Sequence, residues 1–319
     1  MQFVSLSEPV SSHWPEWAEH NPSRMARDFL FWRHLRVVRA RAMRHVFHAA
    51  ERAFPSVSER PVTSVYGVRM MPNWADRTYA YCHYGTYGCY LSDLIGSLDQ
   101  PFAFVDIGAN QGLFSLIAGT NPMCERIVAL EPVPLTHARL EGNLALNGLS
   151  DKALALRFGL SDSASTCTIT THRDHSGLAT LGDHLDQQQE HILTQDVEMR
   201  TIEALDEHLP ADMPIFVKVD VEGHEVTVIE QLLQSRHADR IIGIFYEHDE
   251  SWSAGSALEA VFERSGFSTK RIYGRGKHFD ALATPVTIHS DGGELSESAS
   301  TQGHGLGEDT ASPAYAAAV

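Results

Sequence analysis

The feature that most constrains the fold is a glycine-rich turn that follows a short apolar run and precedes a helical pattern. The apolar run ends in Asp106, and the turn that contains Gly108 and Gly112 leads into the apolar segment 113–118. A strand, a glycine turn and a helix in this order present backbone N–H groups and a helix N-terminus to a polar ligand. Glycines let the backbone approach that ligand closely, because they carry no Cβ. The stretch therefore predicts one unit of an α/β sheet with a ligand at its carboxyl end.

The spacing of this turn, D-x-G-x-N-x-G over Asp106, Gly108, Asn110 and Gly112, differs from the G-x-G-x-x-G of dinucleotide sites. A leading aspartate repels a pyrophosphate but pairs with an ammonium group. The spacing therefore favours a cofactor that carries an amino acid, and S-adenosylmethionine (SAM) is the candidate. An ordinary tight turn is the alternative, so the neighbouring motifs decide between them.

Strand and helix patterns alternate from this turn onward, which predicts parallel strands joined by right-handed crossovers. The last two predicted strands are too close for a helix between them, so we expect an antiparallel hairpin across residues 274–276. By analogy, a mostly parallel sheet with one reversed C-terminal strand is the Rossmann-like α/β fold of class I methyltransferases. The predicted strands are 102–106, 127–131, 153–158, 214–219, 241–246, 268–273 and 279–284, and the predicted helices are 112–119, 134–147, 223–235 and 254–265.

We expect three parts in the chain: an N-terminal extension (1–76), a catalytic domain (77–288) and a disordered acidic tail (289–319). The tail contains no Lys or Arg and too few apolar residues to form a core. The extension predicts an amphipathic helix between residues 22 and 54 that carries eight arginines. This helix packs on the domain or on a second subunit, or it contacts anionic lipid or an acidic partner. Two further segments break the alternation: 55–72, predicted as a linker or an edge hairpin, and 171–198, predicted as a polar loop or lid.

The composition excludes several classes of protein. A net charge of −16 argues against nucleic acid as the main partner. The four cysteines have no zinc spacing, which is typical of a reduced cytosolic protein. The N-terminus lacks the basic leader of a signal peptide, and no apolar segment approaches the roughly 18 residues that span a bilayer. We therefore expect a cytoplasmic protein, either monomeric or homo-oligomeric.

Two more predicted strands end in carboxylates. Glu131, followed by Pro132, lies 19 residues beyond Gly112, close to the spacing at which an acid meets a ribose hydroxyl pair. A third strand contains Lys218 and ends in Asp220, just before a glycine and a helix. Because ligands bind beyond the carboxyl ends of such strands, we expect the three acids to converge on one crevice. A lysine in a buried strand needs a charge partner, either in the protein or in a ligand.

Two histidines are candidates for a general base. His224 is predicted in the first turn of a helix, whose dipole opposes protonation and keeps the imidazole neutral. Neighbouring carboxylates push in the opposite direction, and a capping role is the alternative. His248 follows the next strand on the same predicted rim, beside Glu247. A divalent ion held by the acids of this region is a lesser alternative, and we expect no metal.

Together these motifs resemble the FkbM-type methyltransferases over residues 79 to 285, about two-thirds of the chain. The matching stretches are Asp106–Gly112, Glu131–Pro134 with Leu140 to Gly148, and Lys218–Glu225. The resemblance implies SAM-dependent methyl transfer to a hydroxyl oxygen of a sugar-like or polyketide-derived small molecule, or of a glycan. It implies that Asp106, Gly108, Asn110 and Gly112 hold the methionine part of SAM, and that Glu131 and Pro132 lie at the ribose. It also implies that Asp162 meets the adenine amino group and that Asp220 lies near the transferred methyl. His224 is then the first choice for the base and His248 the second.

Three other functions are weighed against this one. A nucleic-acid or protein methyltransferase is disfavoured by the acidic balance and by Asp220-Val-Glu-Gly223 standing where an N-P-P-Y-like step would be. A nicotinamide-dependent oxidoreductase lacks the dinucleotide spacing. A SAM-binding scaffold without turnover, anchored to a partner by the arginine-rich helix, is disfavoured by intact acids at all three strand ends.

Overall fold

A computed structural model describes residues 42–286 apart from 55, 57, 86, 173–174, 182–191, 250–254 and 276, together with Leu35, Val38 and Arg39. The predicted acidic tail and most of the predicted arginine-rich helix lie outside these residues. Among the described residues, every helix is too short or too polar to span a lipid bilayer.

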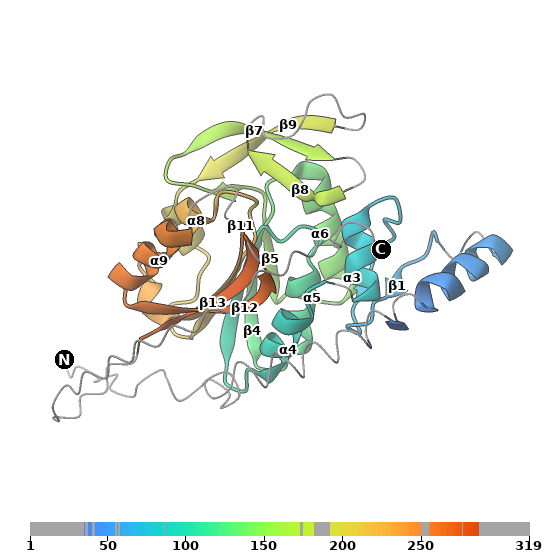
Figure 1. The fold of residues 1–319 in the computed structure, drawn as a ribbon, viewed down its shortest axis with the longest axis horizontal. Helices are drawn as coiled ribbons and strands as arrows, with labels where there is room; N and C mark the ends of the chain where they lie inside the picture. The colour runs from blue at the N-terminus through green and yellow to red at the C-terminus, as the bar shows by residue number, and fades with distance from the viewer. Residues whose placement is uncertain are drawn as a thin grey trace, which may run out of the picture. The chain divides into compact units, whose positions relative to one another are not determined.

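The centre of the fold is a seven-stranded sheet in the order β12-β13-β11-β10-β3-β4-β5 (Figure 1). Neighbouring strands from β11 to β5 run parallel, whereas β13 is antiparallel to both β11 and β12. The predicted mostly parallel sheet with one reversed strand is therefore confirmed. The strands are β3 (Phe102–Ile107), β4 (Cys124–Leu130), β5 (Ala153–Leu156), β10 (Ile215–Val219), β11 (Ile241–Asp249), β12 (Phe267–Arg275) and β13 (His278–Pro285).

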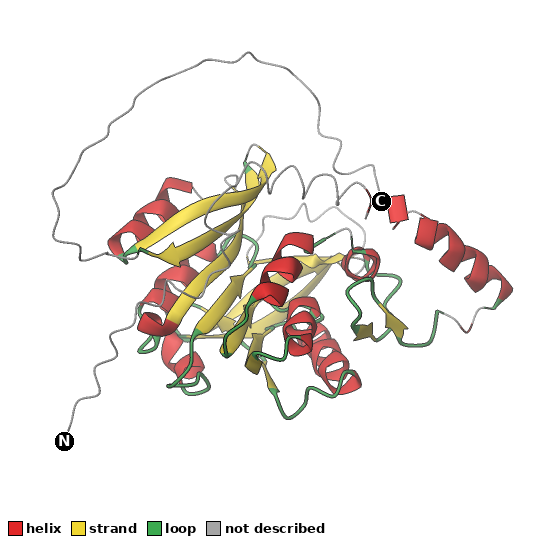
Figure 2. Cartoon of the chain, turned by 90° about the horizontal axis from the view of Figure 1, so that it is seen from below, coloured by secondary structure: helices red, strands yellow, loops and turns green. Residues whose placement is uncertain are grey.

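Both faces of this sheet are covered by helices, as its buried central strands require, since these are apolar apart from Asp106 in β3 and Lys218 in β10. All six residues of β3 are buried. Side chains that alternate along the strands belong to two cores: Phe104 and Phe216 face one, and Val105 and Val217 face the other. The first core includes α4 (Cys89–Ser97), α5 (Leu113–Thr120) and α6 (Pro134–Leu146), and the second includes α7 (Ile202–Asp206), α8 (Glu225–Leu233) and α9 (Gly255–Arg264) (Figure 2).

A second sheet of four strands, β6-β9-β7-β8, corrects the prediction of a loop or lid at 171–198. Its polar composition hid an antiparallel pattern with one solvated face. Ile169, Val197 and Met199 form a small core with Val133, while Thr168 and Asp196 pair on the exposed side. The strands are β6 (Gly159–Leu160), β7 (Ser165–His172), β8 (His175–Leu181) and β9 (Ile192–Arg200), with residues 182–191 outside the description.

The segment before β3 packs on the catalytic domain. The segment forms a hairpin of β1 (Val62–Thr63) and β2 (Arg69–Met70), as one alternative predicted, but this hairpin is a two-stranded sheet of its own and not an edge of the main sheet. Met70 is fully buried in the first core, so the predicted boundary at residue 76 does not separate two cores. Helix α3 (Arg77–Tyr84) follows directly.

The described part of the predicted arginine-rich helix, residues 42–53, contacts the domain through an unexpected residue. The ring of Phe47 lies 4.0 Å from that of Trp74. The periodicity that predicted this helix places Val38 and Val46 on its apolar stripe, yet Val38 is 63% exposed and Val46 is 70% exposed. These two positions do not pack on the domain, which was one of the predicted alternatives; contact with a second subunit, anionic lipid or an acidic partner stays a prediction.

Candidate active site

The turn between β3 and α5, residues 108–112 and hereafter the glycine loop, has a left-handed backbone at Gly108, Asn110 and Gly112. A Cβ on Gly108 would lie 1.8 Å from the backbone oxygen of Asp220, so only glycine fits there. Asn110 adopts φ of 50° without being glycine, and a polar residue of this kind tolerates that region best. The loop thus brings the ends of β3 and β10 into backbone contact.

Asp106 and Lys218 form a buried ion pair beneath the loop. Lys218 Nζ lies 3.3 Å from Asp106 Oδ1 and 3.5 Å from Asp220 Oδ2, and it donates to the carbonyl of Gly108 at 2.6 Å. The other oxygen of Asp106 accepts from the backbone N–H and the hydroxyl of Ser115. Burial opposes the charge of Lys218, but the carboxylates of Asp220 and Asp106 outweigh it and raise the lysine pKa. Of the two alternatives that the sequence left open, Lys218 therefore has its charge partners within the protein.

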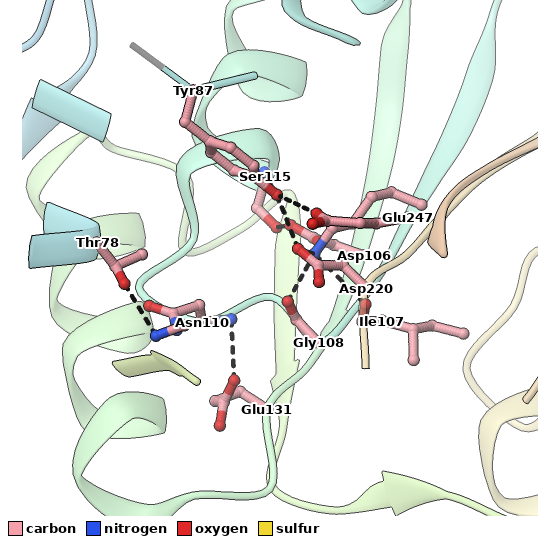
Figure 3. Close-up of polar contacts among 12 residues, drawn as sticks. Thr78, Tyr87, Asp106, Ile107, Gly108, Asn110, Ser115, Glu131, Asp220 and Glu247 are labelled. Atoms are coloured by element: carbon pink, nitrogen blue, oxygen red, sulfur yellow. Dashed lines mark hydrogen bonds and ion pairs between the residues drawn. The ribbon is translucent and has the colours of Figure 1, made fainter. Parts of the chain in front are cut away.

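Glu131 lies just beyond β4 and contacts the glycine loop directly. One of its oxygens accepts from the backbone N–H of Asn110 at 2.9 Å (Figure 3). The other accepts from the backbone N–H of Val133, also at 2.9 Å. Burial raises the pKa of this carboxyl to about 7, although both N–H donors act in the opposite direction. Pro132 follows, and it packs near Gly159 of β6. Glu131 is therefore held against the loop by a backbone hydrogen bond, and its oxygens can accept further hydrogen bonds.

On the other side of the loop, four carboxyl groups form what we call the acid cluster: Asp220, Glu222, Glu247 and Asp280. The hydroxyl of Tyr87 donates to Asp220 Oδ2 at 2.8 Å and lies 3.4 Å from Glu247 Oε2 (Figure 3). Burial, followed by repulsion from neighbouring acids, raises the pKa of Glu222 to about 9 and that of Asp280 to about 8. Like charges this close resist full ionisation.

A histidine at the edge of the acid cluster supplies positive charge. His278 Nε2 lies 2.8 Å from Glu247 Oε1, and its Nδ1 lies 3.5 Å from Asp249 Oδ2. The contact with Glu247 raises the pKa of His278 to about 9. His278 is therefore a cation at neutral pH, and it offsets part of the charge of the cluster.

The structure places His224 and Asp162 together and apart from the contacts of Asp220. His224 is the N-cap residue of α8, and its Nε2 lies 3.2 Å from the hydroxyl of Ser161, next to Asp162 at the end of β6. Burial lowers the pKa of His224, with Asp162 acting in the opposite direction. The imidazole is therefore neutral at physiological pH, and burial, rather than the helix dipole on which the expectation rested, is the cause. Asp162 is exposed and accepts from the hydroxyls of Ser161 and Ser163.

His248, the second candidate base, does not share a face with the acids. Its strand neighbours Glu247 and Asp249 both contact His278 on one face of β11. His248 lies on the other face, 1% exposed, with its ring 5.3 Å from that of Phe279. The sequence predicted both histidines on one rim, because the predicted strand ended at residue 246. The strand runs on to Asp249, so His248 lies within it and points to the opposite face.

Sequence reasoning did not assign three residues of the acid cluster region, namely Tyr87, His278 and Asp280. Tyr87 was part of an aromatic stretch with no distinguishing spacing, and the other two lie in a hairpin whose register comes from pairing with β11. Within the described ranges, no group of three His, Cys, Asp or Glu side chains is arranged to hold a metal ion.

Comparison with known proteins identifies the family. The methyltransferase FkbM domain matches residues 106–271, which contain all three strand-end acids. The chain belongs to the FkbM methyltransferase family. It is 30% identical over 208 residues to Methyltransferase sdnD of Sordaria araneosa, covering 57% of this chain and 79% of that protein. It is 28% identical over 196 residues to Methyltransferase 1 of Beauveria bassiana, covering 56% of this chain and 76% of the relative.

A solved structure of an FkbM methyltransferase from Methylobacillus flagellatus is also similar. The two sequences are 14% identical, and the match covers 67% of this chain and 56% of that protein, with a TM-score of 0.40. Tyr87, His278 and Asp280 lie outside the segment that matches the FkbM domain. The chain is thus a methyltransferase whose acid cluster is completed by residues from beyond that segment.

Proposed function

We propose that this methyltransferase uses SAM and methylates a hydroxyl oxygen of a small molecule or a glycan. One observation carries the proposal: acids at the ends of three neighbouring strands, Asp106, Glu131 and Asp220, all lie at the glycine loop. Family membership supplies the methyl transfer. The acceptor class rests on the resemblance and on the chemistry of the acid cluster.

The residues present fit SAM at several points. Each oxygen of Glu131 accepts one backbone N–H, which leaves a further lone pair on each for the two ribose hydroxyls. Asp162 is exposed at the end of β6 and is our candidate for the adenine amino group. When bound, SAM supplies an electrophilic methyl group on a sulfonium, so positioning contributes much of the acceleration.

For Asp106, a role within the protein replaces the direct contact with the cofactor that the resemblance implies. Its side chain is 0% exposed and is engaged by Lys218 and Ser115. In this proposal Asp106 therefore orders the glycine loop. Backbone groups of Gly108, Asn110 and Gly112, with Asp220 beside them, then face the methionine part of the cofactor.

The proton of the acceptor hydroxyl needs a base, and two residues compete for that role. His224 is neutral and able to accept a proton, although its contacts lie on the side of Ser161. Glu247 lies beside Asp220, and its contact with His278 opposes the burial that raises its pKa. Either base contributes to the rate if the acceptor hydroxyl comes within hydrogen-bond reach.

The test begins with calorimetric titration of SAM and S-adenosylhomocysteine into the wild-type protein and a Glu131→Ala variant. We expect binding that Glu131→Ala weakens by about 1–3 kcal/mol, the cost of losing hydrogen bonds to a charged group. Incubation with methyl-labelled SAM and a panel of glycans, glycosides and polyketide-like alcohols then identifies the acceptor. Absence of SAM binding would refute the cofactor, and binding without release of S-adenosylhomocysteine on any acceptor would favour the scaffold alternative.

A further inference from the structure

Asp76 joins three segments that are far apart in sequence. It is 3% exposed and precedes α3, where its Oδ1 accepts from the N–H of Thr78 at 2.9 Å. The same oxygen accepts from the N–H of Ser176 in β8 at 3.2 Å. Its Oδ2 accepts from the side-chain amides of Gln111 at 2.8 Å and Asn73 at 3.0 Å. One buried carboxylate thus connects the start of α3, the glycine loop and the second sheet.

The glycine-loop partner of Asp76 is itself held on every polar side. Gln111 is 3% exposed; its N–H donates to Asn110 Oδ1 at 2.8 Å, and its carbonyl accepts from Asn143 of α6 at 2.8 Å. Asn143 in turn accepts from the N–H of Met71, beside the β1–β2 hairpin. Gln111 is therefore fixed at its backbone by α6 and at its side chain by Asp76.

Asn110, the residue before Gln111, has a strained backbone conformation that this network holds in place. Asn110 has φ of 50°, and its Oδ1 also accepts from the hydroxyl of Ser176 at 3.1 Å. A non-glycine residue in this region costs free energy and persists only where its surroundings determine it strongly. The N–H of Asn110 is the group that meets Glu131, so the strained conformation aims a donor at the predicted ribose site.

We propose that Asp76 is a positioning residue for SAM: it holds Gln111 and Ser176 so that the glycine loop is already in its binding conformation before the cofactor arrives. This inference rests on the proposed use of SAM. Asp76 lies outside the segment that matches the FkbM domain, so the domain alone does not assign it this role. Preforming the loop raises affinity, because the cofactor does not have to order it.

The substitution Asp76→Ser separates this role from helix capping. Serine is also a good N-cap residue, so it keeps the hydrogen bond to Thr78, but its side chain is too short to hold Gln111 as well. A matched control is Asp206→Ser, because Asp206 of α7 is 6% exposed and accepts from Ser235 Oγ and the N–H of Arg236, which follow the C-terminal end of α8. Both variants lose a buried, hydrogen-bonded carboxylate, and only one of them touches the loop.

The experiment measures SAM dissociation constants by calorimetry, thermal unfolding without ligand, and hydrogen exchange of residues 108–112 in the unliganded protein. We expect Asp76→Ser to weaken SAM binding about tenfold or more, equivalent to about 1.4 kcal/mol, and to speed exchange in the loop. Asp206→Ser should lower thermal stability without changing SAM affinity or loop exchange. Gln111→Leu, which removes the same contact from the other side, should reproduce the affinity loss and decides the matter if Asp76→Ser does not fold.

Unchanged SAM affinity in Asp76→Ser, or in Gln111→Leu where that variant decides, overturns the inference. So does an affinity loss in Asp206→Ser that matches its loss of stability, because the effect is then general destabilisation. A wild-type protein that does not bind SAM refutes the proposed function itself. That result differs from wild-type binding with indifferent variants, which refutes only the role of Asp76.

Discussion

The two sides of the glycine loop are built from different interactions. On the side of Glu131, hydrogen bonds from backbone amides and from neutral Asn, Gln and Ser side chains fix the loop. On the side of Asp220, the four carboxyl groups of the acid cluster lie together, two of them in contact with the hydroxyl of Tyr87, and Lys218 and His278 supply positive charge to Asp220 and Glu247. The first side depends on shape, whereas the second depends on charge balance. We therefore expect substitutions on the two sides to change different measured quantities.

Lys218 links the two sides, and its removal should give the largest effect. Lys218→Met leaves Asp106 buried at 0% exposure without its cation. Breaking a buried ion pair from one side costs about 3–5 kcal/mol, which urea unfolding will measure. The double variant with Asp106→Asn should recover part of that loss, since no buried charge is then left unpaired. A loss below about 1 kcal/mol in Lys218→Met would contradict a buried pair of this kind.

Turnover should depend on the residue that takes the proton of the acceptor hydroxyl, either Glu247 on the charged side or His224 beside Ser161. With an acceptor from the screen, replacing the true base lowers kcat by about 100- to 10,000-fold and leaves SAM affinity near wild type. His224→Gln and Glu247→Gln test the two candidates in parallel, and Asp249→Asn controls for loss of the second partner of His278. A drop in SAM affinity with His224→Gln would instead show that this histidine is a structural residue in contact with Ser161 and not the base.

The sequence predicted the glycine loop and the acids at the neighbouring strand ends, because that information is local, whereas the contacts of Asp76 and Ser176 with the loop join distant segments and were not predicted. Asp106, Gly108, Asn110 and Gly112 lie within seven consecutive residues, and the strand ends at Glu131 and Asp220 follow from apolar runs that stop at an acid. The parallel direction of the central strands and the C-terminal hairpin also followed from the spacing of the elements, with strand ends correct to within three residues.

The charge-dependent side could not be predicted in the same way. Tyr87 meets Asp220 across 133 positions of sequence, and His278 reaches Glu247 only through the register of β13 on β11. The second sheet was missed because its apolar residues are few and its polar face dominates the composition. Pairings between distant segments carry no local signal, so tertiary structure was needed to find them.

Backbone fit on the shape-dependent side should give the next largest effect. Gly108 and Gly148 both have left-handed backbones, with φ of 73° and 70°, yet only Gly108 lies against another backbone atom. Gly148→Ala should cost about 1 kcal/mol from conformation alone. Gly108→Ala should cost clearly more and also abolish measurable SAM binding, because its Cβ displaces the end of β10. Equal costs in urea unfolding would show that the contact with Asp220 is not tight.

The smallest predicted effect is a pH dependence that reports on Glu131. Burial raises its pKa to about 7, and the ionised carboxylate is the better acceptor for ribose hydroxyls. SAM affinity should therefore be constant above pH 7 and fall by up to about tenfold for each unit below it, as linkage requires. Glu131→Gln should bind more weakly and lack this dependence, and the titration of the cofactor's own ammonium cancels when the two proteins are compared.

The stability of the unliganded protein should change with pH in the opposite direction at this residue. Because the pKa of Glu131 is higher in the folded protein than its ordinary value of 4.5, the folded state binds more protons between pH 4.5 and 7. The contribution of Glu131 to stability is therefore fully present below that window and is lost as pH rises through about 7. Urea unfolding of wild type and Glu131→Gln across this window isolates the contribution, since histidines such as His224 are common to both. A Glu131-dependent stability that instead rose with pH would contradict a raised pKa of this carboxyl in the folded protein.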